Sequence, residues 1–466
     1  MSASDNTELL QALAALVGSD GVLTDAMSLL RYGGERTGGL VHRPSAVALP
    51  RTVAQVQRIV QLAVTEGVAI VPVGGATGLS GGAVAQRGEL VVALDRLDEI
   101  VDFNPVDRTV RCGAGVITAQ LQAFAREQGL YYPVDFASSG SSRLGGNIAT
   151  NAGGTRVIRH GMTRDWVASV KLVSGTGELF DFNRGLVKNN TGYDLRHLVI
   201  GAEGTLGIIV EATMRLAPAP RDPAVALLAV ADVPAAMSVL STYRDVLPLT
   251  AFELFCAAAL EKVLAAGALQ RPLAGESPWY VLLEFEQPHG AAGDVPLELF
   301  RDCAARGLVS DGVVGRSATQ ARSLWRLRED ISESLAPWTP WKNDIATVPS
   351  RLPDLVDDVE ALAGELCPDL ERVWFGHVGD GNMHLNVLRP AELTAEAFGE
   401  RCAEFASGLF DILRRHGGSV SAEHGVGLLK KDYLHFTRSA QEVALMRGIK
   451  AVFDPHGIMN PGKIFD

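Results

Sequence analysis

Cysteine is scarce in this sequence, and its positions form no recognisable framework. The 466 residues contain five cysteines, at 112, 256, 303, 367 and 402. Their number is odd, and no two of them form a C-x-x-C pair. This pattern excludes a disulfide-stapled domain, an iron–sulfur protein and a zinc knuckle, and it predicts a reducing compartment.

Positive charge and long apolar runs are also in short supply. Lysine and arginine total 42 against 54 aspartate and glutamate, which gives a net charge of -12 and argues against a nucleic-acid or anionic-membrane partner. No apolar run reaches the roughly 20 residues that cross a bilayer. Residues 1–20 are typical of a capped helix and lack the basic region of a signal peptide. We therefore expect a soluble, cytoplasmic protein of two or three domains.

Two nucleotide-binding fingerprints are missing. The glycine-rich stretch 67–84 never gives G-x-G-x-x-G, which counts against a nicotinamide cofactor. Residues 457–464 have the spacing of a phosphate loop, but a proline lies inside it and isoleucine stands where serine or threonine would hold magnesium. We discount a nucleoside triphosphate site there.

Glycine itself is abundant, and it is concentrated in three loops of the first half, at 67–84, 138–154 and 199–216. Glycines let the backbone approach a ligand closely, and consecutive N–H groups bind anions. One such loop is explained well enough by tight turns. Three in one domain predict a large phosphate-bearing cofactor.

Two histidines flank a short turn in FGHVGDGNMHLNV, residues 375–387. Asp380-Gly381 between two apolar runs predicts a two-residue hairpin loop, which would pair His377 with His384. Opposed residues have Cβ atoms about 4.5–5.5 Å apart, so two imidazoles there could hold one metal ion. Asn386 would point to the same face. Half-buried histidines bonded to backbone and water explain this pair equally well.

Six motifs, taken together, carry a family resemblance. They are PVGGATGLSGG, GGNIATNAGG, GAEGTLGII, FGHVGDGNMHLNV, SAEHGVGLLKKDYL and DPHGIMNPGKI. In their order and approximate spacing the chain resembles the FAD-linked 2-hydroxyacid dehydrogenases of the vanillyl-alcohol-oxidase superfamily. The resemblance runs from about Arg43 to Ile464, and it is specific for the family rather than for the substrate.

The resemblance implies an α+β fold in three parts. Residues 1–219 would form the two-subdomain FAD-binding domain of the vanillyl-alcohol-oxidase (PCMH) type, followed by a linker, RLAPAPRDPA. Residues 220–418 would form a mixed α+β substrate- and metal-binding domain with an antiparallel sheet. Residues 419–466 would complete the active site and return to the FAD domain. A homodimer is common among such proteins.

The implied FAD would be non-covalent, because no histidine lies between His42 and His160, whereas sister enzymes often attach the flavin to a histidine of the first loop. The 73–82 loop would hold the pyrophosphate, 145–154 would pack near the isoalloxazine, and 203–209 would line the adenine and ribose. The residues implied are Val73, Gly74, Gly75, Thr77, Gly78, Ser80, Gly81, Gly140, Ser141, Gly145, Gly146, Asn147, Thr150, Gly153, Gly154, Glu203, Gly204, Ile209 and Asn460.

The resemblance also supplies a third metal ligand and a base. In the family an acidic residue, here Glu423, joins the two hairpin histidines on a divalent metal, usually zinc, although these ligands accept manganese, cobalt or iron too. Such a set leaves one coordination position open, as catalytic zinc sites do. His424 matches the proton acceptor, which requires the chain to turn near Gly425. Taken alone, His424 is equally well explained as structural.

Substrate choice is expected in residues 323–349. Arg322 and Arg326 lie one turn apart and are explained as solvated residues or as ones paired with Glu329 and Asp330. By resemblance, Arg328 and Lys342 would face the substrate, with Ser332 a weaker candidate. Two cations suit a second carboxylate, since guanidinium pairs with it bidentately.

The implied reaction is the FAD-dependent, metal-assisted oxidation of a D-2-hydroxy acid, D-2-hydroxyglutarate being the expected substrate, with hydride transfer to flavin N5. D-lactate or glycolate oxidation is the alternative within the same class. A catalytically silent FAD-binding subunit and a flavin- or metal-storage protein are alternatives from other classes. The expected electron acceptor is an electron-transfer flavoprotein or a quinone.

Overall fold

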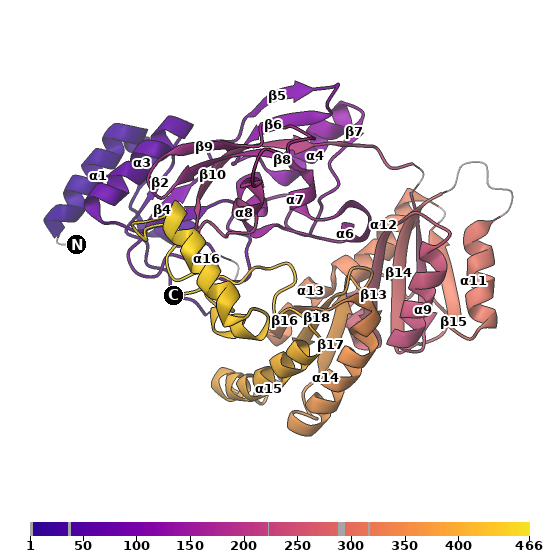
Figure 1. Cartoon of the computed structure of the whole chain (residues 1–466). Helices are drawn as coiled ribbons and strands as arrows, with labels where there is room; N and C mark the ends of the chain where they lie inside the picture. Colours follow the sequence, from indigo (N-terminus) through magenta and orange to yellow (C-terminus); the bar gives the residue numbers. More distant parts are fainter. Residues whose placement is uncertain (1–2, 36–38, 222, 288–293, 316) are drawn as a thin grey trace. The chain divides into compact units, whose positions relative to one another are not determined.

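The computed structural model describes residues 3–35, 39–221, 223–287, 294–315 and 317–466, which divide into two compact units (Figure 1). The first unit comprises Met1–Gly153, Met162–Ala219 and Glu423–Asp466. The second comprises Gly154–Gly161 and Pro220–Ala422. The last segment of the chain therefore belongs with the first unit, although most of the second unit lies between them in sequence.

The first unit contains two main sheets. In one, β2 (Ala46–Ala48), β4 (Leu90–Ala93) and β3 (Ile70–Val73) run parallel, and β1 (Val22–Leu23) pairs antiparallel with β2. The other is antiparallel, in the order β5 (Ile100–Asn104), β6 (Thr109–Gly113), β10 (Gly207–Arg215), β8 (Val167–Ser174) and β9 (Leu179–Phe182).

Helices accompany both sheets. They are α1 (Ala3–Val17), α2 (Ala26–Tyr32), α3 (Val53–Glu66), α4 (Thr118–Glu127), α5 (Leu144–Thr150), α7 (Thr163–Trp166), α8 (Arg196–Val199) and α16 (Ala440–Phe453), with short 3₁₀ turns at Ser19–Gly21 and Lys431–Phe436. Helix α3 shows why one of them forms. Thr52 and Gln55 make a reciprocal capping box at its start, and Gly67 ends it at φ 63°.

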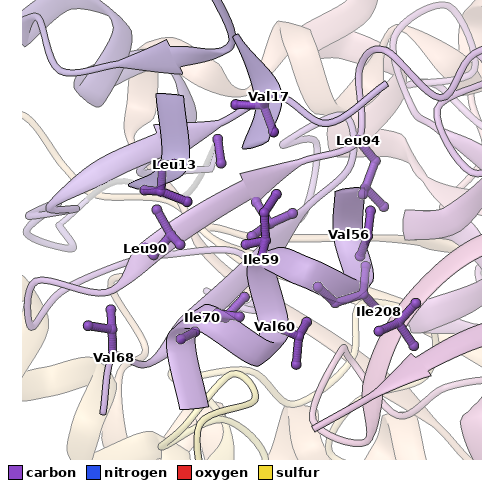
Figure 2. Close-up of a cluster of buried hydrophobic side chains, with 14 of the residues drawn as sticks. Leu13, Val17, Val56, Ile59, Val60, Val68, Ile70, Leu90, Leu94 and Ile208 are labelled. Atoms are coloured by element: carbon purple, nitrogen blue, oxygen red, sulfur yellow. The ribbon is translucent and has the colours of Figure 1, made fainter. Parts of the chain in front are cut away.

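The core of the first unit joins its two sheets through α1 and α3 (Figure 2). The buried face of α3 follows helical spacing and lies against residues of β3, β4 and β10. The end of the chain also takes part, because the N–H of Ile70 donates to the carbonyl of Ile458 at 2.8 Å and Asn460 donates back to Ile70 at 2.8 Å. Buried residues of the cluster include Leu13, Val17, Val56, Ile59, Val60, Val68, Ile70, Leu90, Leu94 and Ile208.

The expected linker is shorter than its composition suggests. β11 (Ala217–Pro218) pairs with β7 (Leu130–Tyr131) in the first unit, and β12 begins at Pro223 in the second. The prediction that all of RLAPAPRDPA is a linker is therefore wrong. Proline is compatible with both strands because Pro218 ends one and Pro223 starts the other, where no ladder hydrogen bond is lost.

The second unit is built on one seven-stranded sheet that is antiparallel throughout. Its order is β15 (Val309–Gly315), β12 (Pro223–Val230), β14 (Trp279–Glu286), β13 (Leu249–Cys256), β17 (Arg372–Gly376), β18 (Asn382–Val387) and β16 (Trp341–Ala346). The apolar and aromatic run WYVLLEFE forms β14, in the interior of the sheet.

Helices cover both faces of this sheet. One face packs on α10 (Ala257–Ala265), α12 (Ala318–Glu329) and α13 (Ile331–Ser334), through a core that includes Phe255 and Phe375. Trp374, the neighbour of Phe375, points the other way and donates to Glu360 of α14 (Leu352–Leu366) at 2.6 Å. The remaining helices are α6 (Val157–His160), α9 (Val233–Arg244), α11 (Val295–Ala305) and α15 (Ala395–Arg415).

The α+β prediction, with an antiparallel sheet in the second part of the chain, is confirmed by these two units. Within the described ranges, no helix combines the length and the apolar character that a membrane span requires.

Candidate active site

A cavity in the first unit is lined by all three glycine-rich loops. Many of the predicted cofactor residues lie around it, namely Val73, Gly74, Gly75, Thr77, Gly78, Ser80, Gly145, Gly146, Asn147, Thr150, Glu203, Gly204 and Ile209. Sequence reasoning missed further lining residues, chiefly Glu35, Ala83, Leu94 and Arg143. His424, which the resemblance implies as the proton acceptor, lines the same cavity.

The glycines of this cavity make close backbone contacts that no larger residue would permit. A Cβ atom at Gly75 would lie 2.4 Å from the carbonyl oxygen of Ser141, and one at Gly145 would lie 2.7 Å from the Cβ of Ala114. A Cβ atom at Gly74 would lie 3.3 Å from the Cα of Gly146. Two loops thus meet backbone to backbone, and a cavity walled by glycine backbone suits a phosphate-bearing ligand such as FAD.

The other predicted cofactor residues do not line this cavity within the described part of the chain. Asn460 supports two of its loops, since its side-chain amide donates to the carbonyls of Gly82 and Glu203 at 2.8 and 2.7 Å. The N–H of Gly81 donates to Glu35 at 2.8 Å, and the carbonyl of Ser141 packs against Gly75. Gly140 is exposed. Gly153 is the last residue of its segment of the first unit, and Gly154 is the first of the second.

The predicted hairpin forms in the second unit, but in a different register. Phe375 lies opposite His384, and the carbonyl of His377 accepts from the N–H of Asn382 at 3.2 Å. The prediction that His377 faces His384 is therefore wrong by two residues. A shift of two keeps both histidines on one face, and their ring centroids are 5.5 Å apart.

The register follows from a contact that the hairpin sequence does not contain. Gly381 has φ 94°, and a Cβ atom on it would lie 1.9 Å from the carbonyl oxygen of Thr347. The N–H of Thr347 in turn donates to the carbonyl of Gly381 at 3.0 Å. The turn thus packs against the chain that follows β16 and is hydrogen-bonded to it. Asp380-Gly381 is therefore not an isolated two-residue loop.

Glu253 is a buried carboxylate that sequence reasoning missed. It lies on β13 with no exposed side-chain surface, and its Oε1 is 2.8 Å from Nδ1 of His377. Its Oε2 is 2.8 Å from Nε of Arg328, as an ion pair without the alignment of a hydrogen bond. The Arg328 guanidinium also lies 4.9 Å from the centroid of the Phe375 ring. A single acidic residue in the apolar strand LTAFELFC was the available signal.

Asp344 is a second carboxylate missed by sequence reasoning, and it lies beside the other histidine. It is directly opposite His384 in the β16–β18 ladder, and its Oδ1 is 3.7 Å from Nδ1 of His384, beyond hydrogen-bond distance. Its oxygens accept from the Asn382 amide at 2.9 Å and from the N–H of Ala422 at 3.1 Å. A histidine and a carboxylate whose donor atoms face each other at this spacing suit a divalent metal ion.

Asp380, in the hairpin turn, adds a third acidic group to this end of the sheet. Burial raises its pKa to about 6, and the neighbouring Glu253 raises it too, while His377 acts in the opposite direction. Several carboxylates gathered around two histidines in a poorly solvated place concentrate negative charge, which favours a bound cation.

Two of the predicted substrate residues lie on the strands that carry Asp344 and His384. Lys342 and Asn386 are opposite each other in the β16–β18 ladder, two residues along from Asp344 and His384, so they share their face. Lys342 is exposed and Asn386 is buried. Ser332 lies exposed on α13. Arg326 pairs with Asp330 at 2.8 Å, which confirms the ion-paired interpretation of that arginine.

The segment around Glu423 is turned rather than extended. Gly425 has φ 79°, as expected for a chain that bends immediately after His424. Nε2 of His424 lies 3.8 Å from Oε1 of Glu423, so the two neighbours face one way. This bend removes the objection that adjacent strand residues point to opposite faces.

The comparisons with known proteins agree with this architecture. Residues 219–464 match the family described as FAD linked oxidases, C-terminal domain, and residues 44–183 match the FAD binding domain. The chain belongs to the FAD-linked oxidases. The predicted family and the predicted FAD-binding domain are thereby confirmed, and the glycine-lined cavity lies within the unit that carries the FAD-binding match.

Two bacterial relatives of this FAD-linked oxidase are similar over almost their whole length. A D-2-hydroxyglutarate dehydrogenase of Stutzerimonas stutzeri is 50% identical over 457 residues, covering 98% of each chain. One of Xanthomonas citri pv. viticola is 51% identical over 443 residues, covering 95% of this chain and 94% of the relative. Among solved structures, p-cresol methylhydroxylase with substrate bound has a TM-score of 0.79 at 17% identity, covering 100% and 98% of the two chains. That likeness concerns the fold alone.

Proposed function

We propose that this FAD-linked oxidase oxidises a D-2-hydroxy acid to the 2-oxo acid, with D-2-hydroxyglutarate as its substrate. Two relatives that match it over almost their whole length are named D-2-hydroxyglutarate dehydrogenase. One observation on this chain carries the chemistry. Only Glu423 separates Ala422, whose N–H bonds to Asp344, from His424, which lines the cofactor cavity. A three-residue run therefore connects the candidate metal ligands to the candidate FAD site.

His377, His384 and Glu423 would hold a divalent metal, with zinc as the proposed ion. Adjacent Cα atoms are about 3.8 Å apart, so Glu423 must lie close to Ala422, whose N–H is bonded to Asp344. Asp344 is itself a further candidate ligand, because its Oδ1 faces His384. Glu253, bonded to Nδ1 of His377, would fix the tautomer that presents Nε2 as the ligand atom.

The reaction removes a hydride from the hydroxyl-bearing carbon and a proton from its hydroxyl. When bound, FAD supplies the hydride acceptor, and the metal supplies a Lewis acid that makes the hydroxyl more acidic. His424 would accept the hydroxyl proton, since imidazole is a suitable base near neutral pH.

Arg328 and Lys342 would select a substrate with a second carboxylate. Arg328 is held in place by Glu253 on one side and the Phe375 ring on the other, so little rotamer freedom would be lost on binding. Lys342 stands on the strand that carries Asp344, on the same face of the sheet. Two cations would favour D-2-hydroxyglutarate, which has a second carboxylate, over D-lactate or glycolate, which have only one.

Reoxidation would pass electrons to an electron-transfer flavoprotein or a quinone, and a homodimer is the proposed assembly. All five cysteines are free, which supports a reducing compartment such as the cytoplasm.

The test is anaerobic reduction of the bound flavin. Purified protein with full FAD and metal content is mixed separately with D-2-hydroxyglutarate, D-malate, D-lactate and glycolate, and the flavin absorbance is followed. Rapid bleaching by the D-dicarboxylates alone is the expected result. Bleaching mainly by D-lactate or glycolate would remove the proposed carboxylate clamp. No bleaching by any of the four would contradict the proposed activity and favour a silent FAD-binding subunit.

A further inference from the structure

Glu203, which lines the cofactor cavity, makes an unusual pair of hydrogen bonds. Its Oε1 accepts from the N–H of Val426 and its Oε2 accepts from the N–H of Gly427, both at 2.7 Å. The side chain is buried, and the two N–H groups belong to a segment more than two hundred residues further along the chain. Each oxygen of one carboxylate thus bonds to one of two consecutive amides, an arrangement that fixes orientation as well as distance.

The first of the two amides that Glu203 holds lies two residues after His424. Gly425 bends the chain at φ 79°, and a Cβ atom there would lie 3.0 Å from the Glu203 carboxylate. Beyond the clamp, the N–H groups of Leu428 and Leu429 both donate to the carbonyl of Ser80, at 2.9 and 3.0 Å. The turn that follows His424 is therefore fixed to two of the three glycine-rich loops.

The backbone of Glu203 is strained, and it is held on both sides. Its φ is +50°, which residues other than glycine seldom adopt. Its N–H donates to the carbonyl of Ala149 at 2.8 Å, and its carbonyl accepts from the side-chain amide of Asn460 at 2.7 Å. Strain of this kind persists only where the surroundings determine the conformation, and it marks positions where geometry matters.

The electrostatics show that the carboxylate is kept here at a cost. The pKa of Glu203 is raised to about 7, chiefly by burial and to a smaller extent by the charge of Glu35, even though the two backbone hydrogen bonds and Lys430 lower it. An alanine or leucine would avoid that desolvation but could not accept from either amide.

We infer that Glu203 is a positioning residue for His424: its carboxylate holds the 425–427 turn and so sets the direction in which the imidazole enters the cofactor cavity. This inference rests on the proposed role of His424 as the base. It assigns Glu203 a role other than the predicted contact with adenine and ribose. A misplacement of about 1 Å at a reacting group can cost on the order of 100-fold in rate.

The first test is the Glu203→Gln variant. Glutamine keeps the size but has one acceptor oxygen, so its amide NH₂ would face one of the two N–H groups, donor against donor. We expect FAD and metal content to stay at the wild-type level, reduction by dithionite to be unchanged, and reduction by D-2-hydroxyglutarate to slow by about 10- to 100-fold. Reduction by substrate at the wild-type rate, or loss of FAD as the sole defect, would overturn the inference.

A second variant and a matched control separate positioning from folding. Glu203→Asp keeps the charge, tolerates positive φ and cannot reach both amides, so it should show the same slow reduction. Asp454 is the control, because its two oxygens likewise accept from consecutive amides, those of Ile458 and Met459, at 3.1 and 2.9 Å. Asp454→Asn should lower thermal stability without slowing reduction. The inferred role of Glu203 is wrong if both Glu203 variants are reduced by substrate at the wild-type rate. It is also wrong if Asp454→Asn slows this reduction as much as the Glu203 variants do.

Hydrogen exchange tests the clamp without any turnover. Peptides covering 424–430 should exchange faster in Glu203→Gln than in the wild type, and equally in Asp454→Asn and the wild type. Equal exchange in all three proteins would overturn the clamp. If the wild-type flavin is not reduced by any hydroxy acid while exchange responds as expected, the proposed function has failed but the clamp stands.

Discussion

Nδ1 of His377 lies 2.8 Å from Oε1 of Glu253, a carboxylate with no exposed side-chain surface. The same carboxylate faces Arg328 through its other oxygen. One buried charge therefore orients a candidate metal ligand and a candidate substrate-binding cation at once. A carboxylate bonded to the far nitrogen of a ligating histidine fixes its ring and increases its basicity.

Replacing Glu253 with glutamine should weaken metal binding. The amide is the same size but carries no charge, so the His377 ring would lose its strongest orienting partner. Metal affinity should fall about 10- to 100-fold, as is typical when a residue that hydrogen-bonds to a metal ligand is replaced. Competition with a chelator, followed by metal analysis of the protein, measures the change. A Glu253→Gln protein that holds its metal as tightly as the wild type would show that His377 is not a ligand oriented by Glu253.

Arg328→Lys should change the preference between substrates. Lysine keeps the positive charge beside Glu253 but lacks the planar fork that pairs with a carboxylate. We expect kcat/KM for D-2-hydroxyglutarate to fall about 10- to 100-fold, the equivalent of one charged hydrogen bond, and that for D-lactate to fall much less. The ratio of the two constants is the measurement, because any shared effect through Glu253 cancels in it.

Arg326→Lys is the matched control for this experiment. Arg326 lies on the same helix, two residues earlier, and pairs with Asp330 at the surface. The substitution should leave the ratio unchanged. If kcat/KM in Arg328→Lys falls equally for both substrates, Arg328 does not select the substrate and serves only as a structural partner of Glu253.

Local patterns in the sequence predicted much of the fold. The apolar and aromatic run WYVLLEFE is typical of a buried strand and forms β14, and Ser439 and Glu442 form the capping box that starts α16. The two hairpin strands were also predicted correctly. Each of these features depends on residues within a few positions of one another, so the sequence alone is sufficient to predict it.

The errors have non-local causes. The hairpin register is set by the contact of Gly381 with Thr347, which follows a different strand. The roles of Glu253 and Asp344 depend on partners that lie 124 and 38 positions away, His377 and Asn382. A carboxylate in an apolar strand is a recognisable signal of a buried polar partner, but the strand does not reveal which residue that partner is.

FAD should be released completely when the protein is denatured. Among the described residues that line the cavity, His424 is the one histidine, and the first glycine-rich loop has none to form a covalent bond. Acid or heat precipitation should therefore leave all of the yellow colour in the supernatant. Absorbance spectra of the supernatant and the redissolved pellet measure the partition, and flavin retained in the washed pellet would contradict a non-covalent site.

Gly75→Ala should weaken FAD binding. The added methyl group would lie 2.4 Å from the carbonyl of Ser141 and 2.9 Å from the Cα of Ser142, so one of the two backbones must move. We expect at least a tenfold weaker affinity, about 1.4 kcal/mol. Fluorescence titration of the apoprotein with FAD measures it. Gly140→Ala is the control, because no atom lies within 4 Å of its added Cβ. Equal affinity in both variants would show that close loop packing does not shape the site.

Glu284→Gln should destabilise the second unit in a pH-dependent way. The buried Glu284 carboxylate accepts from Arg156 at 2.9 and 3.1 Å, from Trp325 at 2.9 Å and from Thr250 at 2.7 Å. Burial alone would raise its pKa, but the charge of Arg156 and these hydrogen bonds outweigh burial and lower the pKa below the usual 4.5. Removing one partner of such a pair costs about 3–5 kcal/mol.

The sign of the pH effect follows from the lowered pKa. The stabilisation from ionised Glu284 is fully present above its unfolded-state pKa of about 4.5, and it is lost as pH falls through the lower folded-state value. The gap in melting temperature between the wild type and Glu284→Gln should therefore be constant near neutral pH and narrow below about pH 4.5.

Glu360 is a matched control, since it too accepts from an arginine and a tryptophan, Arg372 and Trp374. Its side chain, however, is 36% exposed against 9% for Glu284. Glu360→Gln should cost less than about 1 kcal/mol, because solvent screens an exposed pair. A gap for Glu284→Gln that stays the same down to pH 3.5 would show that its ionised form is not what stabilises the unit.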